Sequence, residues 1–470
     1  MGREFLRVVS IDEALNVILR VAESVSQEIS AKKERVRLSE ALGRISAADL
    51  HAPFDIPPFD RATVDGYAVI AEDTFYAEED APAVLSLRGE LRAGEVPKVS
   101  VQRGTCVAIS TGAPMPAGAD AVVKVENTEL AEKSGSGGGS GGSGGSGGVG
   151  AGERRFVVGA EGEGSEKVKV KIFKPVVPAE NVQRAGSDIR KGERILSEGT
   201  LLTPRETGLL AACGFSEVLV RKKVRVGVLS TGNEIVSVDH TKLPPGKIYD
   251  VNMRTISDAV RLCGCVPVQL GVAPDDFDEI EARLKAFQQG TSSSGEVDVF
   301  VVSGGTSAGA GDIVPAVLER NGEILVHGVD IKPGKPFAFG IFSGKPLFAL
   351  PGNPTSALLS FSLFVAPFLK RISSASVSGT ANEKVEEKCL KARTSQRIIS
   401  EKGRNEFVFV RLERSSGGEM LATPILKGSG AVSTLASADG YIFVEKGREI
   451  VEAGETVEIR LLTPDNFPLL

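Results

Sequence analysis

Three carboxylates follow three different apolar stretches in the second half of the sequence. Glu234 closes the turn STGNE, Asp275 lies in the turn APDD, and Asp312 closes VVSGGTSAGAGD. Hard cations such as Mg²⁺ prefer oxygen ligands and combine a few carboxylates with substrate oxygens. These acids, set beside glycine-rich backbone, therefore favour a Mg²⁺-assisted phosphate or pyrophosphate site. Glu234, Asp275 and Asp312 are its candidate metal ligands.

The stretch that ends in Asp312 starts with the pattern of a buried strand and continues with glycines. Ser303, Gly304, Gly305 and Ser307 lie where the apolar run ends. Glycine lets the backbone turn tightly and approach a ligand closely, with N–H groups that can face an anion. We expect these four residues to bind an anionic substrate, although an ordinary strand-to-helix turn has the same composition. The stretch matches neither of the two common glycine-rich phosphate signatures.

Positive charge and short polar groups occur close to these turns. Lys332 and Lys335 flank a Pro-Gly turn in IKPGKPFAFG, just before another apolar run. A rigid turn would direct both ammonium groups at an anion, and the alternative is a solvated lysine loop. Asp250 and Asn252 in IYDVN are short polar groups that suit substrate hydroxyls or a ring amide.

From Lys223 onward, short apolar runs alternate with helical patterns. The expected strands are residues 224–229, 265–272, 297–302, 323–326, 337–341 and 347–350. The expected helices are Met253–Cys263, Phe277–Gln288, Ile313–Arg320 and Pro354–Arg371. This alternation predicts a doubly wound α/β sheet with helices on both faces. Ligands of such sheets bind outside the carboxyl ends of the strands, where the acidic turns and the glycine-rich stretch follow.

The remaining segments predict helical and β-rich parts. Residues 10–29 have the spacing of an amphipathic helix, with Ser10 and Glu13 in a capping-box pattern. Residues 82–125 alternate β-rich runs with Gly/Pro turns, and the runs after Ser378 predict a small terminal β-barrel or sandwich. The Gly/Ser tract 134–152 cannot bury apolar surface, so we assign it no chemistry and expect it to extend a surface hairpin loop.

Composition excludes several classes of protein. The formal charge is −6, from 55 basic and 61 acidic side chains, which argues against a general nucleic-acid binder. The five cysteines form no Cys-x-x-Cys and the three histidines are scattered, so neither a disulfide framework nor a zinc site is expected. The N-terminal residues lack a signal-peptide pattern, and no apolar run approaches the length of a membrane span. Cytoplasmic localisation is the default expectation.

Nine motifs together resemble the molybdopterin molybdenumtransferase family, which includes bacterial MoeA and the C-terminal E domain of gephyrin. In chain order they are ALGRISAADL, PPFDRATVDGYAV, ISTGAPMPAGADAVV, NVQRAGSDIRKG, STGNE, IYDVN, SGGTSAGAGD, IKPGKPFAFG and LPGNPTSA. The motifs run through most of the chain and keep the family's order. Each alone is weak to moderate, but a chance match of all nine in order is negligible.

The resemblance implies insertion of molybdenum from molybdate into adenylated molybdopterin, with Mg²⁺ and with release of AMP. It implies an elongated cytoplasmic homodimer whose cleft in the α/β domain is completed by the partner's β domain. The expected domains are residues 1–52 with 189–222, residues 53–188, the α/β domain 223–377 and a C-terminal β-barrel 378–470. A complex with the pathway's adenylyltransferase is a further implied partner, whereas nucleic acid and membrane are not.

The resemblance also assigns roles position by position. The matching catalytic positions are Asp65, Thr111, Asp188, Glu234, Asp275 and Asp312, and the lysines of the KPGKP motif are Lys332 and Lys335. Pro351 and Pro354 match a proline turn near the oxyanion site. Under this hypothesis Mg²⁺ bridges the pyrophosphate, the lysines and glycine-rich amides hold phosphate or molybdate, and Asp65 orients the attacking species.

Two departures from the family pattern remove positive charge near the expected cleft. Gln183 precedes the single Arg184 where relatives often have several arginines, and Gly328 stands where some have a lysine. Two other functions stay open at this point: a molybdopterin adenylyltransferase, which would predict a short single-domain chain, and a gephyrin-like scaffold. The sequence does not distinguish molybdate from tungstate, which are nearly equal in size and charge.

Overall fold

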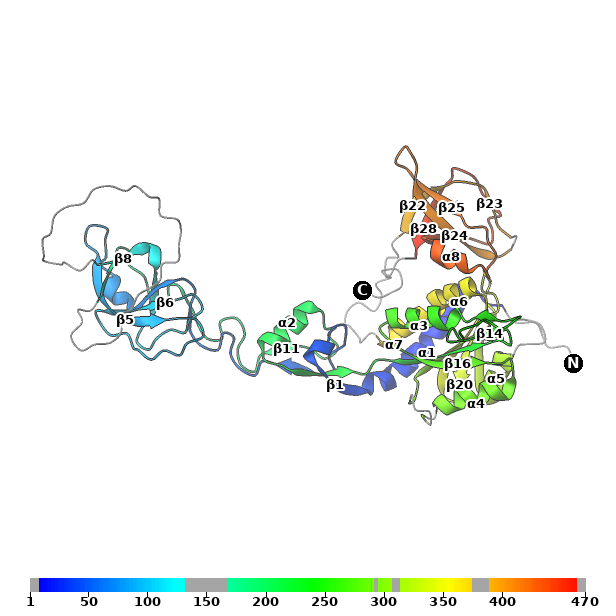
Figure 1. Ribbon diagram of the computed structural model, residues 1–470, viewed down its shortest axis with the longest axis horizontal. Helices are drawn as coiled ribbons and strands as arrows, with labels where there is room; N and C mark the ends of the chain where they lie inside the picture. The colour runs from blue at the N-terminus through cyan, green and yellow to red at the C-terminus, as the bar shows by residue number, and fades with distance from the viewer. Residues whose placement is uncertain are drawn as a thin grey trace. The chain divides into compact units, whose positions relative to one another are not determined.

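The computed structural model describes residues 8–131, 168–288, 290, 295–306, 313–373, 389–401 and 403–462. The Gly/Ser tract 134–152 and the predicted site residues Ser307 and Asp312 lie outside this part. The chain divides into two compact units (Figure 1). The first comprises Met1–Ala48, Ser197–Gly208 and Phe215–Leu470, and the second comprises Asp49–Leu196 and Leu209–Gly214.

The first unit begins with the predicted amphipathic helix, α1 (Ile11–Ala31). Ser10 forms the predicted capping box, because its Oγ accepts from the Glu13 N–H at 3.2 Å and the Glu13 carboxylate accepts from the Ser10 N–H at 2.8 Å. Ala14, Ile18, Ala22 and Ile29 are the buried face of α1, which belongs to the core of the α/β region.

A six-stranded mixed sheet forms the centre of this unit, in the order β16-β13-β17-β21-β20-β18. These strands are β13 (Arg225–Thr231), β16 (Val266–Ala273), β17 (Val299–Ser303), β18 (Gly322–His327), β20 (Ala338–Phe342) and β21 (Lys345–Leu350). The first four strands of the order are parallel, whereas β20 is antiparallel to both of its neighbours. All six predicted strands are therefore present, within one or two residues at most of their ends.

Helices cover both faces of this sheet, as predicted. They are α3 (Asn252–Leu262), α4 (Phe277–Gln288), α5 (Ile313–Asn321), α6 (Pro354–Ser360) and α7 (Ala366–Ser373), with a π-helical turn at Phe361–Val365 joining the last two. Successive residues of β17 point to opposite faces: Val301 joins the core beneath α1, α3 and α7, and Phe300 joins the core beneath α4 and α5. Figure 1 shows these helices on the two sides of the sheet.

The helical run Pro354–Ser373 is apolar and long enough to cross a membrane by length and composition. The sequence alone suggested no such stretch. Most of this run is buried, and its aromatic rings pack on the sheet: the ring centroids of Phe364 and Phe337 are 4.4 Å apart, and those of Phe368 and Phe348 are 5.1 Å apart. Its apolar character is therefore explained by the core of the α/β region.

The C-terminal strands close into a five-stranded barrel rather than a sandwich. The strands are β22 (Cys389–Thr394), β24 (Asn405–Arg414), β25 (Met420–Pro424), β26 (Gly440–Val444) and β28 (Thr456–Leu461). Their order is β24-β25-β22-β28-β26, and pairing of β26 with β24 completes the ring. A short strand of the α/β region, β19 (Ile331–Lys332), extends the barrel by pairing with β24. Helix α8 (Val432–Ser437) precedes β26.

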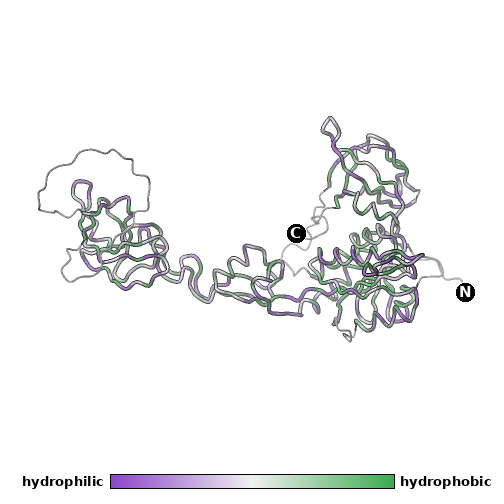
Figure 2. Tube along the Cα trace, in the orientation of Figure 1, coloured by the Kyte–Doolittle hydropathy of each residue, from purple (hydrophilic) through white to green (hydrophobic). Residues whose placement is uncertain are grey.

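The second unit contains a six-stranded sheet in the order β7-β4-β6-β5-β9-β8. Its strands are β4 (Gly66–Val69), β5 (Ala83–Leu91), β6 (Thr105–Ile109), β7 (Ala121–Lys124), β8 (Thr128–Leu130) and β9 (Lys169–Ile172). Apolar residues lie on both faces, with Tyr67 and Val69 in one core cluster and Ala68 in the other. Figure 2 colours the chain by hydropathy and shows hydrophobic stretches in both units.

Short strand pairs and turns complete the described structure. The pairs are β1 (Lys33–Arg37) with β12 (Glu217–Arg221), β2 (Leu50–His51) with β11 (Arg194–Leu196), β3 (Arg61–Ala62) with β10 (Val182–Gln183), β14 (Ile235–Val236) with β15 (Ile248–Tyr249), and β23 (Ile398–Ile399) with β27 (Ile450–Val451). Short 3₁₀ turns lie at Leu38–Glu40, Ala71–Thr74 and Val125–Asn127, and α2 spans Pro204–Ala212.

The capping box gives a first prediction. Ser10→Ala removes the acceptor for the Glu13 N–H, so we expect a loss of about 1 kcal/mol in local stability at the start of α1. Faster amide hydrogen exchange in the first turn of α1 measures this loss. Ser24→Ala is the control, because Ser24 lies inside α1 and its hydroxyl donates to the Val21 carbonyl. Equal exchange rates in the two variants would contradict a capping role.

Candidate functional site

One edge of the central sheet collects most of the predicted site residues of the first unit. Because β13, β16, β17 and β21 are parallel, the turns that follow them emerge at the same edge. Strand β20 runs in the opposite direction and its first residue, Ala338, pairs with Ala349 near the end of β21. The segment that contains Lys332 and Lys335 therefore enters the sheet from this edge too. Strand β13 lies between β16 and β17, so this edge is a topological switch point, where open α/β sheets bind ligands.

The buried side chain of Asn252, at the start of α3, joins two of the turns at this edge. Its Nδ2 donates to Ser303 Oγ at 2.7 Å and to the Gly352 carbonyl at 2.7 Å. Ser303 Oγ in turn donates to the Pro351 carbonyl at 3.3 Å. The predicted residues Asn252, Ser303 and Pro351 are thus brought together in one hydrogen-bonded cluster.

Two glycines let the turn after β17 lie against the end of β13. Gly304 has a φ of +101°, and a Cβ at this position would lie 2.3 Å from the Thr231 carbonyl oxygen. Gly305 has a φ of +62°, and a Cβ there would lie 3.1 Å from Thr231 Oγ1. A side chain at either position would therefore be strained and, at Gly304, would overlap the backbone of β13. The positive φ and the close approach to Thr231 explain why glycine occupies positions 304 and 305.

Four buried polar atoms at this edge lack a hydrogen-bond partner among the described residues. They are Ser230 Oγ, Thr231 Oγ1, Asp250 Oδ2 and Asn252 Oδ1, and only three further side-chain atoms in the described part of the chain share this property. A buried polar atom without a partner costs about 1–3 kcal/mol, so such atoms are rare and often mark a functional site. Their concentration at a switch point indicates a site for a polar ligand.

Sequence reasoning missed two of these four residues. Ser230 and Thr231 stand in STGNE, where the chemistry predicted from the sequence concerns only the acid Glu234. The sequence feature that could have identified them is the pair of hydroxyl residues at the end of β13, where apolar side chains are expected.

The carboxylates Glu234 and Asp275 lie in neighbouring turns of the same edge, and both are exposed. Asn233 links the turns, because its Oδ1 accepts from the Asp275 N–H at 3.2 Å. Among the described residues no three His, Cys, Asp or Glu side chains are grouped closely enough to hold a metal ion, and Asp312 lies outside them. The donor set still suits Mg²⁺, which commonly takes one or two carboxylates from the protein and further oxygens from substrate phosphates and water.

The two lysines of the KPGKP motif differ in their surroundings. Lys332 Nζ lies 3.1 Å from Glu406 Oε1 and 3.3 Å from Glu401 Oε2, both on the barrel side of the unit. Partial burial lowers the pKa of Lys332, but hydrogen bonding and the charge of Glu406 outweigh it, so the net pKa is raised. Lys335 is exposed and has no carboxylate partner among the described residues. Of the two, Lys335 is the cation that is free to meet an anion.

The remaining predicted site residues belong to the second unit. Asp65 Oδ1 accepts from both the backbone N–H of Thr111 at 2.7 Å and its hydroxyl at 2.9 Å. The pairing of these two residues therefore holds both exposed side chains in place. Asp188 is exposed, and its N–H donates to the Ile56 carbonyl. Gln183, one of the departures from the family pattern, accepts at Oε1 from Arg61 Nε at 2.9 Å.

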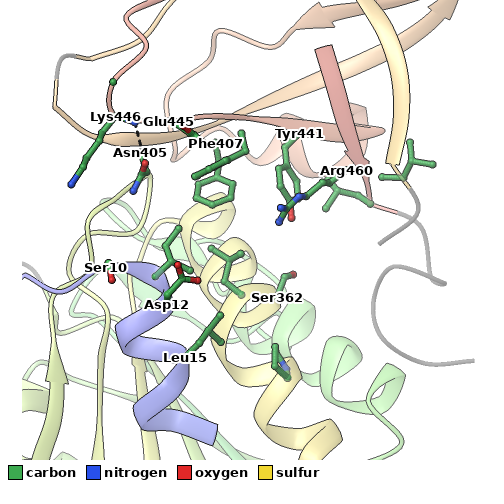
Figure 3. Close-up of a pocket in the computed structure, with 17 residues that line it drawn as sticks. Ser10, Asp12, Leu15, Ser362, Asn405, Phe407, Tyr441, Glu445, Lys446 and Arg460 are labelled. Carbon is green, nitrogen blue, oxygen red and sulfur yellow. Dashed lines mark hydrogen bonds between the residues drawn. The ribbon is translucent and has the colours of Figure 1, made fainter. Parts of the chain in front are cut away.

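A separate pocket of about 520 Å³ lies between α1, the helical run that ends in α7, and the barrel (Figure 3). Leu15, Phe407 and Tyr441 contribute apolar surface, and Asp12 and Arg460 contribute charge. None of the predicted site residues that the structure describes lines this pocket.

Family models match three parts of the chain. Residues 9–214 match the MoeA N-terminal region (domain I and II), residues 227–371 match a probable molybdopterin binding domain, and residues 391–462 match the MoeA C-terminal region (domain IV). The chain belongs to the MoeA family. The second match contains the whole switch-point edge, with Asn252, Ser303 and the glycines.

Individual relatives extend over nearly the full chain. The molybdopterin molybdenumtransferase of Bacillus subtilis is 30% identical over 97% of this chain and 95% of its own length, and that of Haemophilus influenzae is 33% identical over 91% and 93%. A crystal structure of the molybdopterin biosynthesis MoeA protein of Pyrococcus horikoshii is similar with a TM-score of 0.72 and 37% identity, covering 97% of this chain and 100% of the other. The predicted MoeA-type fold, with its α/β domain and terminal barrel, is therefore confirmed.

The close approach of Gly304 to β13 gives a second prediction. Gly304→Ala adds a Cβ that overlaps the Thr231 carbonyl, so we expect it to lose at least about 2 kcal/mol more stability than a substitution that introduces backbone strain alone. Gly246→Ala is the matched control, because Gly246 also has a positive φ of +75° but no atom lies within 4 Å of the added Cβ. Denaturation midpoints of the two variants measure the difference, and similar midpoints would refute the clash.

Proposed function

We propose that this MoeA-family chain is a molybdopterin molybdenumtransferase, which inserts molybdate-derived molybdenum into adenylated molybdopterin and releases AMP. The observation that carries this proposal is the group of buried, unpartnered polar atoms at the switch point, within the part that matches a molybdopterin binding domain. The curated names of the relatives from Bacillus subtilis and Haemophilus influenzae support the same activity.

The polar atoms at the switch point suit the pterin part of the substrate. A pterin ring and its side chain present several hydrogen-bond donors and acceptors, and the hydroxyls of Ser230 and Thr231 can act as either. Asp250 Oδ2 and Asn252 Oδ1 are acceptors, which suit ring N–H groups. Gly304 and Gly305 allow the backbone of the turn after β17 to lie directly against Thr231, next to these groups.

The charged groups suit the pyrophosphate and the oxyanion. Exposed Lys335 would bind phosphate or molybdate, and Glu234 and Asp275, with Asp312, would hold Mg²⁺. The cation would stabilise negative charge that develops on the leaving phosphate. Lys332 keeps its proton in its ion pairs and would act at longer range, because Glu401 and Glu406 already balance its charge.

The second unit carries Asp65, Thr111 and Asp188, which we propose as further catalytic residues. The two hydrogen bonds from Thr111 fix the Asp65 carboxylate, so that it can orient an attacking oxygen rather than rotate freely. We further propose a cytoplasmic homodimer in which the second unit of one subunit completes the site of its partner. The four domain ranges expected from the sequence, and a complex with the pathway's adenylyltransferase, remain part of this proposal.

The carboxylate at position 234 tests the proposed chemistry. Glu234→Gln keeps the shape of the side chain but removes its charge, so molybdate-dependent AMP release should fall by about 10²-fold or more. Glu323→Gln, an exposed change on β18 of the same domain, should leave the rate unchanged. Full activity of Glu234→Gln would refute the assignment. Adenylation of free pterin with ATP by the unmodified protein would instead support an adenylyltransferase.

The unpartnered hydroxyl of Thr231 allows a prediction with two opposite effects. Thr231→Val removes a buried hydroxyl that has no partner in the described structure, so stability should be unchanged or higher. Binding of molybdopterin should weaken about tenfold, because a substrate hydrogen bond is lost.

Thr434→Val is the matched control for that experiment. Thr434 in α8 is equally buried and its hydroxyl is also unpartnered among the described residues, but it lies outside the proposed site. It should share the stability effect and leave molybdopterin affinity as it is. Titration calorimetry and thermal denaturation separate the two effects, and unaltered affinity in Thr231→Val would remove Thr231 from the site.

A further inference from the structure

A loop of the barrel, residues 427–431, reaches the turn that follows β21. Ser429 makes the contacts: its Oγ accepts from Asn353 Nδ2 at 2.9 Å, and its carbonyl accepts from Thr355 Oγ1 at 2.5 Å. The Thr355 N–H points to the same carbonyl at 3.4 Å. Thr355 is buried, so its bond to the Ser429 carbonyl is partly shielded from water, whereas the bond between the Asn353 and Ser429 side chains is exposed. The barrel is therefore bonded directly to the turn that carries Pro351 and Pro354.

The pattern of these bonds is unusual for the start of a helix. Asn353 is the N-cap residue of α6, where an asparagine side chain ordinarily accepts a hydrogen bond from the first turn of its own helix. Here Asn353 makes no such bond and donates to Ser429 instead. The capping acceptor for Thr355 is the Ser429 carbonyl. Helix α6 thus takes its cap from the barrel, which makes the position of the turn depend on the barrel loop.

The same turn holds the centre of the candidate site. The carbonyl of Gly352, next to Asn353, accepts from Asn252 Nδ2, and the Pro351 carbonyl accepts from Ser303 Oγ. A Cβ on Gly352 would lie 3.6 Å from Gly304 Cα, so the turn also packs on the glycine-rich turn after β17. The bond to the barrel and the bond to Asn252 are thus made by adjacent residues, Asn353 and Gly352. A shift of the turn would move Asn252 and Ser303 with it.

We propose that Ser429 is a positioning residue for molybdenum insertion, which holds the turn 351–353 and through it the Asn252 and Ser303 side chains in their binding geometry. The proposal deepens the proposed function and rests on it. In this proposal Ser429 acts through Asn353, to which its side chain is hydrogen-bonded. The loop 427–431 makes the C-terminal barrel a structural part of the site.

Independent contacts keep the barrel in place when this bond is lost. Strand β19 pairs with β24, and Lys332 is paired with Glu401 and Glu406. Phe407 and Tyr441 of the barrel belong to the core of the α/β region. Removal of the Ser429 hydroxyl therefore changes the turn locally and leaves the attachment of the barrel intact.

The test uses Ser429→Ala in the full-length protein, with molybdopterin and its adenylated form as probes. We expect pterin binding to weaken and kcat/KM for AMP release to fall by about fivefold to tenfold, the effect of one hydrogen bond. Ser433→Ala is the control, because Ser433 Oγ accepts from Lys427, the first residue of the same loop, but makes no hydrogen bond to the turn after β21 among those of the described residues. Its affinity and activity should match those of the unmodified protein.

A second comparison distinguishes positioning from a general structural role. In an Asn252→Ala background, Ser429→Ala should cause no further loss of pterin affinity, because the group through which it acts is gone. Independent, additive losses in the double variant would overturn the proposal, and so would unchanged affinity in Ser429→Ala alone. If the unmodified protein neither binds molybdopterin nor releases AMP, the proposed function itself fails, which is a distinct result.

Discussion

The hydrogen bonds of the Asn252 amide are the interaction on which the candidate site depends. A single Nδ2 group joins the ends of β17 and β21 to the start of α3, which follows β13 in the chain. These elements come from distant parts of the sequence, and the parallel sheet alone would bring their ends only to the same edge. The amide fixes the distance between the turns, and the glycines permit the contact of the backbones. Its second polar atom, Oδ1, is buried and has no hydrogen-bond partner among the described residues.

The sequence predicted much of the first unit because its elements follow local rules. Runs of β-branched and aromatic residues gave every strand of the central sheet, and the capping box located the start of α1. The structure places the predicted residues Glu234, Asp275 and Asn252 at one edge of the sheet, because the ends of its parallel strands share that edge, and their roles stay predictions. Family motifs supplied Asp65 and Thr111, and the structure shows these two residues in direct contact.

What the sequence did not predict depends on pairing between remote segments. The charge of Lys332 is balanced by Glu401 and Glu406, which approach it because β19 pairs with a barrel strand more than seventy residues later in the chain. The role of Ser429 has the same origin, since no local pattern connects a serine in a barrel loop to the N-cap of α6. Ser230 and Thr231 are not predicted, because short hydroxyl side chains at the end of an apolar strand carry no sequence pattern that distinguishes a binding role from a structural one. The roles of Ser307 and Asp312 remain predictions from the sequence.

The pairing of β19 with β24 limits how far the barrel can be separated from the α/β region. The β19–β24 pairing and the burial of Phe407 and Tyr441 in the core of the α/β region mean that the boundary between sheet and barrel is crossed by backbone hydrogen bonds and aromatic packing together. Cutting the polypeptide there would bare an unsatisfied strand edge and an apolar face on the severed fragment. The barrel and the sheet are therefore expected to unfold as one cooperative piece, and replacement of the barrel by another domain would have to restore both kinds of contact.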